Sequence, residues 1–189
     1  MINLSTHVDQ LTVLAEALVD FKDLATNKFN LRDVVSFQNW ANYFERLYEP
    51  VYSDLVKDFW IHAYVFESGH VCSSVHGKKI FITEKDIAKL YSLERTGTRL
   101  TDVSLDETEK ANIANVIFQE GSTDQKAKSL ISKLRVWFMI ILGSFNPRCQ
   151  TNSPDYVNND QKYLLHAIHT SEKVNLPAIL FKHLKTTII

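Results

Sequence analysis

One stretch of the chain constrains the fold more than any other, the apolar segment between residues 123 and 142. Its large apolar side chains recur at three- and four-residue steps, and past Val136 they occupy nearly every side of a helix. They are Leu130, Ile131, Leu134, Trp137, Phe138, Ile141 and Leu142. Because a helix that is apolar all round must be buried, we expect this segment to run through the centre of the fold.

The rest of the chain also favours helices. Only 5 glycines and 4 prolines occur in 189 residues, too few for the tight turns of a β-sandwich or barrel. Helical spacing predicts an N-terminal helix over residues 6–25 and a second helix from residue 31 to Pro50. The predicted fold is mainly α, with about seven helices, an N-terminal helix within residues 1–30 and a helical domain over residues 31–189. These two parts are expected to form one continuous domain. We expect the domain to be truncated at its C-terminus within a longer protein, because Thr187-Ile188-Ile189 is not a natural polar ending.

Residues 70–82 have a different pattern, which predicts one small β-hairpin. Apolar and small residues alternate over 71–75, a turn is expected at His76-Gly77-Lys78, and residues 79–82 form the second strand. Thr83 then provides a cap for a short helix over residues 84–90. We expect this helix to pack on the hairpin rather than to begin a helix-turn-helix, because Thr96-Gly97-Thr98 is a poor helix former.

Composition and the lack of targeting or membrane-spanning patterns indicate where in the cell the protein is expected. Its formal net charge is −1, and its two cysteines, Cys72 and Cys149, are too few for a disulfide framework. The N-terminus lacks the pattern of a signal peptide, and the longest strongly apolar run, Val136–Leu142, is far shorter than the roughly 20 residues that cross a bilayer. We therefore expect a soluble intracellular protein, in the nucleus or cytoplasm, with no membrane partner.

Charge is distributed unevenly along the chain, which makes nucleic-acid binding an alternative function. Residues 1–120 carry 12 basic and 18 acidic side chains, whereas residues 121–189 carry 9 basic and 4 acidic ones. The candidate contacts, expected on the polar side of the helix over residues 123–142, are Lys126, Lys128, Lys133 and Arg135. Solvated helix faces explain the same charges more simply, because no run reaches five or six like charges.

Metal binding and catalysis have little support in the sequence. His70, Cys72 and His76 share one face of a strand and would offer zinc three ligands, but no fourth ligand is near and ordinary hairpin residues are the favoured interpretation. The acids between residues 102 and 109 lie at a helix start, where negative charge is favoured anyway. Phosphate-binding glycine loops and the nucleophile elbow are missing. We expect no cofactor, no catalytic residue and no small-molecule substrate.

Nine short blocks within residues 37–189 carry a family resemblance. They are WANYF (40–44), YEPVY (48–52), LVKDFW (55–60), VHGKKI (75–80), TEKDIAKL (83–90), FNPR (145–148), LLHAI (164–168), VNLP (174–177) and ILFKH (179–183). In this order the blocks resemble the plant transposon protein domain of retroelement-derived, envelope-like or gag-associated open reading frames. The strand-turn-strand-helix piece is more distantly similar to the plant mobile domain. The resemblance implies an element-encoded protein without an assigned catalytic residue, so it transfers no site to this chain.

Three functions remain open from the sequence. The leading hypothesis is a non-catalytic binding or assembly module that acts on a protein partner or through self-association, with exposed apolar or aromatic patches. The alternative is a nucleic-acid-binding module that uses the basic C-terminal third. The third is a metal-dependent nuclease or transposase fragment.

Overall fold

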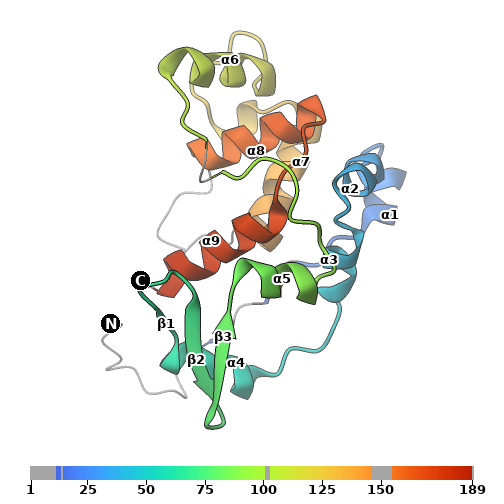
Figure 1. The fold of residues 1–189 in the computed structure, drawn as a ribbon. Coiled ribbons are helices and arrows are strands. Elements are labelled where there is room, and N and C mark those ends of the chain that lie inside the picture. The colour runs from blue at the N-terminus through green and yellow to red at the C-terminus, as the bar shows by residue number, and fades with distance from the viewer. Residues whose placement is uncertain (1–11, 14, 101–102, 146–154, 189) are drawn as a thin grey trace.

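The computed structural model describes residues 12–13, 15–100, 103–145 and 155–188, which form mainly helices and one small sheet (Figure 1). Within these residues the helices are α1 (Phe21–Thr26), α2 (Arg32–Gln38), α3 (Ala41–Arg46), α4 (Ser53–His62), α5 (Glu84–Leu90), α6 (Glu107–Ile117), α7 (Ser132–Ile140), α8 (Asn159–Thr170) and α9 (Leu176–Ile188). The strands, antiparallel and in this spatial order, are β1 (Tyr64–Val65), β2 (Val71–Val75) and β3 (Lys78–Ile82). A short 3₁₀ turn (Ala127–Ser129) precedes α7 and a π-helical turn (Ile141–Phe145) follows it.

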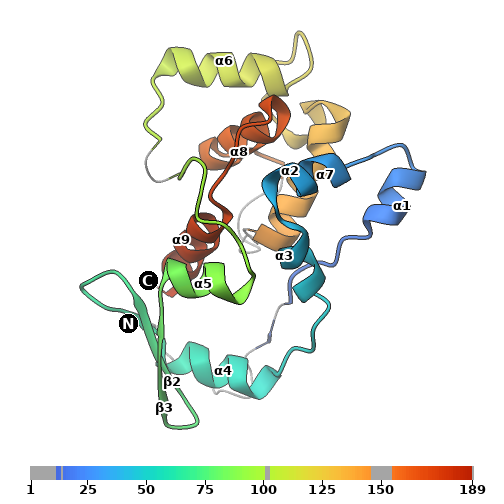
Figure 2. The same ribbon diagram turned by 45° about the vertical axis from the view of Figure 1, so that its right-hand side comes forward.

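The sheet lies at one end of the molecule (Figure 1). Helices α6, α7 and α8 gather at one end, whereas the sheet and α4 form the other (Figures 1 and 2). Helix α9 runs between the two ends and contacts both α5 and β1. In the part of the chain that the structure describes, no helix is long and apolar enough to cross a membrane.

The centre of the fold is built around α7, as the sequence predicts. The ring of Trp40 packs edge-on against Trp137 at 6.2 Å and against Phe145 at 5.1 Å between ring centroids. Tyr43 joins this cluster, and its hydroxyl donates a 2.5 Å hydrogen bond to the carbonyl of Ser144. Burial raises the pKa of Tyr43. The predicted core residues of this segment that are almost fully buried are Leu130, Leu134, Trp137, Phe138 and Ile141.

The central helix is shorter than the predicted span of 123–142, because it begins only at Ser132. The residues before α7 instead form a loop around the carboxylate of Asp124. This carboxylate accepts hydrogen bonds from the Ser129 hydroxyl at 2.6 Å and the Lys126 amide at 3.2 Å. These hydrogen bonds, with that of Ser129 the strongest, lower the pKa of Asp124 to about 2. Local side-chain hydrogen bonds thus replace the helix that the apolar spacing indicated.

The N-terminal prediction was wrong in the described residues. Helix α1 covers only Phe21–Thr26, capped by Asp20, and residues 12–13 and 15–20 are not helical. The backbone of Ala17 is bonded elsewhere: its amide donates to Gly143 at 2.8 Å, and its carbonyl accepts from the Ser144 hydroxyl at 3.0 Å. Docking on the turn after α7 therefore competes with helix formation. The predicted residues 6–11 and 14 lie outside the described residues.

One further prediction needs correction, one strand was not predicted, and two predictions are confirmed. The single helix expected from residue 31 is divided at Asn39, whose φ of 58° is left-handed and ends α2. Strand β1 was not predicted at all. The hairpin is confirmed, with Val75 paired to Lys78 across His76-Gly77, both of which have positive φ (48° and 75°) as such a turn requires. Helix α5 is confirmed with its predicted bounds and its Thr83 cap.

Candidate binding surface

The register of the sheet separates aliphatic from aromatic side chains. Tyr64, Cys72 and Phe81 are direct cross-strand partners and therefore project from one face. Val65, Val71 and Ile82 form the next row and project from the opposite face, where the Ser73 hydroxyl donates to the Phe59 carbonyl of α4 at 2.7 Å. Helix α4 thus covers the aliphatic face, whereas on the other face Tyr64 and Phe81 are exposed on either side of the buried Cys72.

The face opposite α4 exposes aromatic rings. Tyr64 is 53% exposed, Phe66 48% and Phe81 60%, although an outward strand face normally carries polar side chains. The ring of His70 stacks on Phe66 at 5.5 Å and meets Phe81 edge-on at 6.4 Å between centroids. We call Tyr64, Phe66, His70 and Phe81 the aromatic face.

Cys72 lies beneath the aromatic face and is only 3% exposed. Tyr64 is its direct cross-strand partner, and interaction with the Cys72 side chain raises the pKa of Tyr64.

The hairpin that carries the aromatic face is anchored to α4. The carboxylate of Asp58 accepts a 2.6 Å hydrogen bond from the amide of His76, at the tip of the turn. Together with the bond between Ser73 and Phe59, this fixes the hairpin against α4 at two points. A lone hairpin is only marginally stable in water, so these contacts are needed to hold the rings in place.

Directly after β3 the chain enters a buried polar cluster centred on Glu84, the first residue of α5. Arg99 donates to both oxygens of its carboxylate, at 2.9 and 2.5 Å, and Arg95 Nε donates at 3.2 Å. Asn175 Nδ2 contacts the same carboxylate at 3.4 Å and the carbonyl of Arg95 at 3.2 Å. We call Glu84, Arg95, Arg99 and Asn175 the polar junction. It joins α5, the loop after it and the start of α9.

The ionisation of Glu84 follows from this arrangement. Its burial opposes the charged form more than any other single influence, but the hydrogen bonds and charges of Arg99 and Arg95 together outweigh it. The pKa of Glu84 is therefore lower than usual, and the carboxylate is ionised at neutral pH.

Backbone pairing completes the polar junction. Thr98 forms a short parallel bridge with Val174, with hydrogen bonds from the Thr98 amide to Lys173 at 2.8 Å and from the Asn175 amide to Thr98 at 3.0 Å. Gly97 makes this approach possible, because its φ is +90° and a Cβ there would lie 2.6 Å from the backbone of Lys173. The Asn175 side chain also caps α9 by accepting from the Ala178 amide at 3.0 Å.

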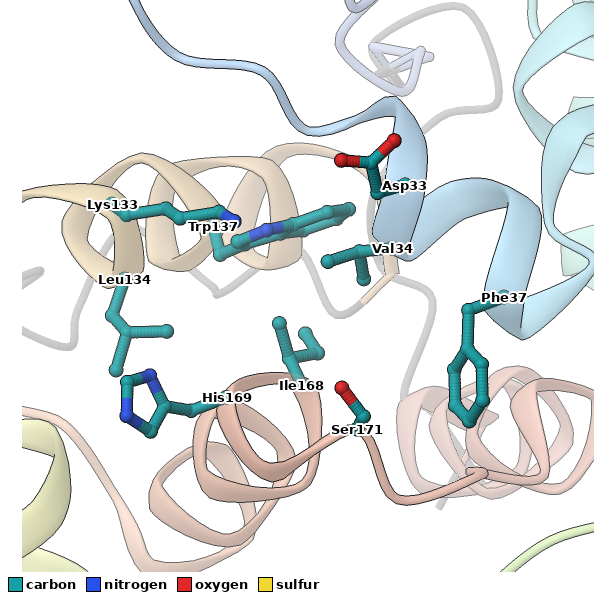
Figure 3. A pocket seen from close by; sticks show the side chains of 9 residues that line it. All are labelled: Asp33, Val34, Phe37, Lys133, Leu134, Trp137, Ile168, His169 and Ser171. Atoms are coloured by element: carbon teal, nitrogen blue, oxygen red, sulfur yellow. The ribbon is translucent and has the colours of Figure 1, made fainter.

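A pocket of about 300 Å³ lies between α2, α7 and α8 (Figure 3). The indole of Trp137 spans one side of it and Ile168 the other, with Asp33 and Lys133 at its edge. Among the described residues, no hydrogen-bond partner contacts the buried Nε1 of Trp137. The volume is at the lower limit for ligand pockets, and the walls are mostly apolar.

The four predicted nucleic-acid contacts do not lie on one helix. Lys126 and Lys128 belong to the loop and 3₁₀ turn before α7, because α7 starts at Ser132. Lys133 and Arg135 are both in α7, but two positions apart on a helix they face in different directions. Arg135 reaches the Lys128 carbonyl at 3.4 Å, whereas Lys133 lines the pocket of Figure 3. The predicted stripe is therefore divided between two surfaces.

The three predicted metal ligands are also separated. His70 is engaged with Phe66 and Ser68, Cys72 is buried under Tyr64, and His76 occupies the turn. Six residues of extended strand span about 20 Å, so residues 70 and 76 share a face without sharing a ligand sphere. In the part of the chain that the structure describes, no group of three or more His, Cys, Asp or Glu residues is placed to hold a metal ion.

The aromatic face and the polar junction were both missed from the sequence. Strand alternation places residues 70, 72, 79 and 81 on one face, but the contribution of Tyr64 and Phe66 to that face depends on β1, which is two residues long.

Comparison with protein-family models, with curated proteins and with solved structures found no match. What describes the protein is therefore its own structure, a mainly helical fold with a small antiparallel sheet that exposes aromatic rings.

Proposed function

We propose that this chain is a non-catalytic binding or assembly module and that the aromatic face is its contact surface. The observation that carries the proposal is the exposure of Tyr64, Phe66 and Phe81 on one face of an anchored sheet. Exposed aromatic clusters are costly in water and are typical of interaction sites. The polar side chains gathered around Glu84 support a non-catalytic role, because they bond to one another and to backbone where α5 and α9 meet.

We further propose that the module belongs to a plant transposable-element-derived protein, in the nucleus or cytoplasm. The resemblance of ordered sequence blocks to the plant transposon protein domain supports this origin. Several of these blocks coincide with the elements that build the sheet and the polar junction, including β3, α5 and the start of α9.

A capture experiment tests the proposed contact surface. The intact chain, immobilised and exposed to plant nuclear and cytosolic extracts, is compared with the double variant Tyr64→Thr/Phe81→Thr, since threonine suits an exposed strand. Tyr52→Thr is the matched control, because Tyr52 is 67% exposed but lies before α4, away from the sheet. Loss of a bound protein, of a bound nucleic acid or of self-association in the double variant alone is the expected result. Equal behaviour of all three proteins would contradict the proposal.

A further inference from the structure

The composition of the aromatic face distinguishes between kinds of partner. By strand alternation, Ser74 and Lys79 project from the same side of the sheet as the four rings of the aromatic face and the buried Cys72. Every large nonpolar side chain in this set is a ring, whereas the aliphatic side chains of the sheet face α4. Protein interfaces mix aromatic with aliphatic anchors and exclude lysine from their centres. Rings that alternate with a cation and small polar residues are instead suited to stacking on flat ligands.

Lys79 supplies a positive charge on this face. It lies two positions before Phe81 in β3, so both side chains project to the same side, and it is opposite Ser74 of β2. The described residues provide Lys79 with no ion-pair partner, and its side chain is exposed. Asp58 of the neighbouring α4 is engaged by the amide of His76. A phosphate beside Lys79 would therefore meet a free ammonium group.

We propose that the aromatic face binds single-stranded nucleic acid, with bases stacked on Phe81 and Tyr64 and a phosphate held by Lys79. This rests on the proposed function, and it names the partner class of the same surface. Aromatic rings on a sheet stack about two or three unpaired bases in known recognition modes, and each stack contributes about 1–3 kcal/mol. Paired bases are already stacked inside a duplex, so the face selects single strands. DNA and RNA share this chemistry.

The structure also explains why these rings are rigid enough to bind. The ring of His70 is held between Phe66 and Phe81. The turn below them is fixed by Asp58. Side chains that are already ordered lose less conformational entropy when a ligand binds, so stacking energy is converted to affinity more completely.

Fluorescence anisotropy tests the inference with labelled oligo(dT) and oligo(U), each about 12 nucleotides long, which is within the usual site size of one sheet-based module. The wild-type chain is expected to bind one or both at low salt and to bind a duplex of the same length more weakly. Phe81→Thr should weaken binding about tenfold or more. Lys79→Gln should lower the slope of the logarithm of affinity against the logarithm of salt concentration by about one. Tyr52→Thr should change binding by less than about twofold.

The outcomes separate this inference from the proposed function. If Lys126→Gln/Arg135→Gln abolishes oligonucleotide binding and Phe81→Thr does not, the basic C-terminal third is the binding surface and the inference is overturned. If no oligonucleotide binds, but Phe81→Thr abolishes capture of a protein or self-association, the proposed function stands and only the partner class is wrong. If Phe81→Thr alters neither, both are wrong. Circular dichroism of each variant establishes that it is folded.

Discussion

Phe81 and Glu84 are three positions apart in the chain but lie in opposite surroundings. Phe81 is an apolar side chain that is 60% exposed, whereas Glu84 is an acidic residue that is only 7% exposed. The carboxylate is surrounded by Arg95, Arg99 and Asn175, while the ring projects from a sheet whose other face is covered. Around Glu84, polar groups are satisfied by the protein itself. Around Phe81, apolar side chains remain exposed and available to a partner. Substitutions in the two regions should therefore differ in their effect on stability.

Gly97→Ala in the polar junction should have the largest effect. The positive φ of residue 97 strains any side chain, and a Cβ would lie 2.6 Å from the backbone of Lys173, so the bridge between Thr98 and Val174 must open. We expect a loss of about 3–4 kcal/mol in the free energy of unfolding, measured by chemical denaturation. Gly77→Ala is a control, because its φ is also positive but no atom lies within 4 Å. A smaller loss for Gly97→Ala than for Gly77→Ala would contradict this account.

Glu84→Gln should have the next largest effect. The amide keeps the shape of the side chain but cannot accept two charge-assisted hydrogen bonds from Arg99, which is partly exposed and so recovers some solvation. We expect a loss of about 2–3 kcal/mol. The exposed Glu107→Gln, which breaks only a surface pair with Lys110, should cost less than about 0.5 kcal/mol. Equal losses would show that the polar junction does not stabilise the fold.

Acid should remove the contribution of Glu84. Because its pKa is lower in the folded protein than its ordinary value of 4.5, the ionised carboxylate stabilises the fold above that pH. The contribution is lost as pH falls from 4.5 through the folded pKa. The difference in unfolding free energy between wild type and Glu84→Gln should therefore be constant near neutral pH and shrink below 4.5. A difference that grows in acid would contradict this direction.

Phe81→Thr should have the smallest effect on stability, although Phe81 lies within β3. Much of the ring is already in water, and threonine suits an exposed strand, so we expect a change of about 1 kcal/mol or less. The melting temperature by differential scanning calorimetry checks this. A large destabilisation would mean that the ring is part of the core rather than a binding surface.

The sequence predicts those parts of the fold whose determinants are local. The hairpin depends on alternation and on Gly77, and α5 depends on the Thr83 cap, so both were predicted with nearly correct bounds. The burial of Trp137 follows from apolar spacing in the same way.

Elements that depend on distant partners were not predicted. Ala17 bonds to Gly143 instead of to its own helix, and Asp124 reorganises the residues before α7. The polar junction joins Glu84 to Asn175, 91 positions later, so no local pattern indicates it. The aromatic face requires β1, whose two residues are too few for a periodic signal.

Amide hydrogen exchange of the wild-type chain, with and without saturating oligo(dT) or oligo(U), tests the central claim most directly. Binding should slow exchange in residues 64–66, 70–74 and 79–82, while segments around α6 and α8 remain unchanged. Protection confined to residues 126–135, or no protection at the sheet despite bound oligonucleotide, would contradict the assignment of the aromatic face as the binding surface.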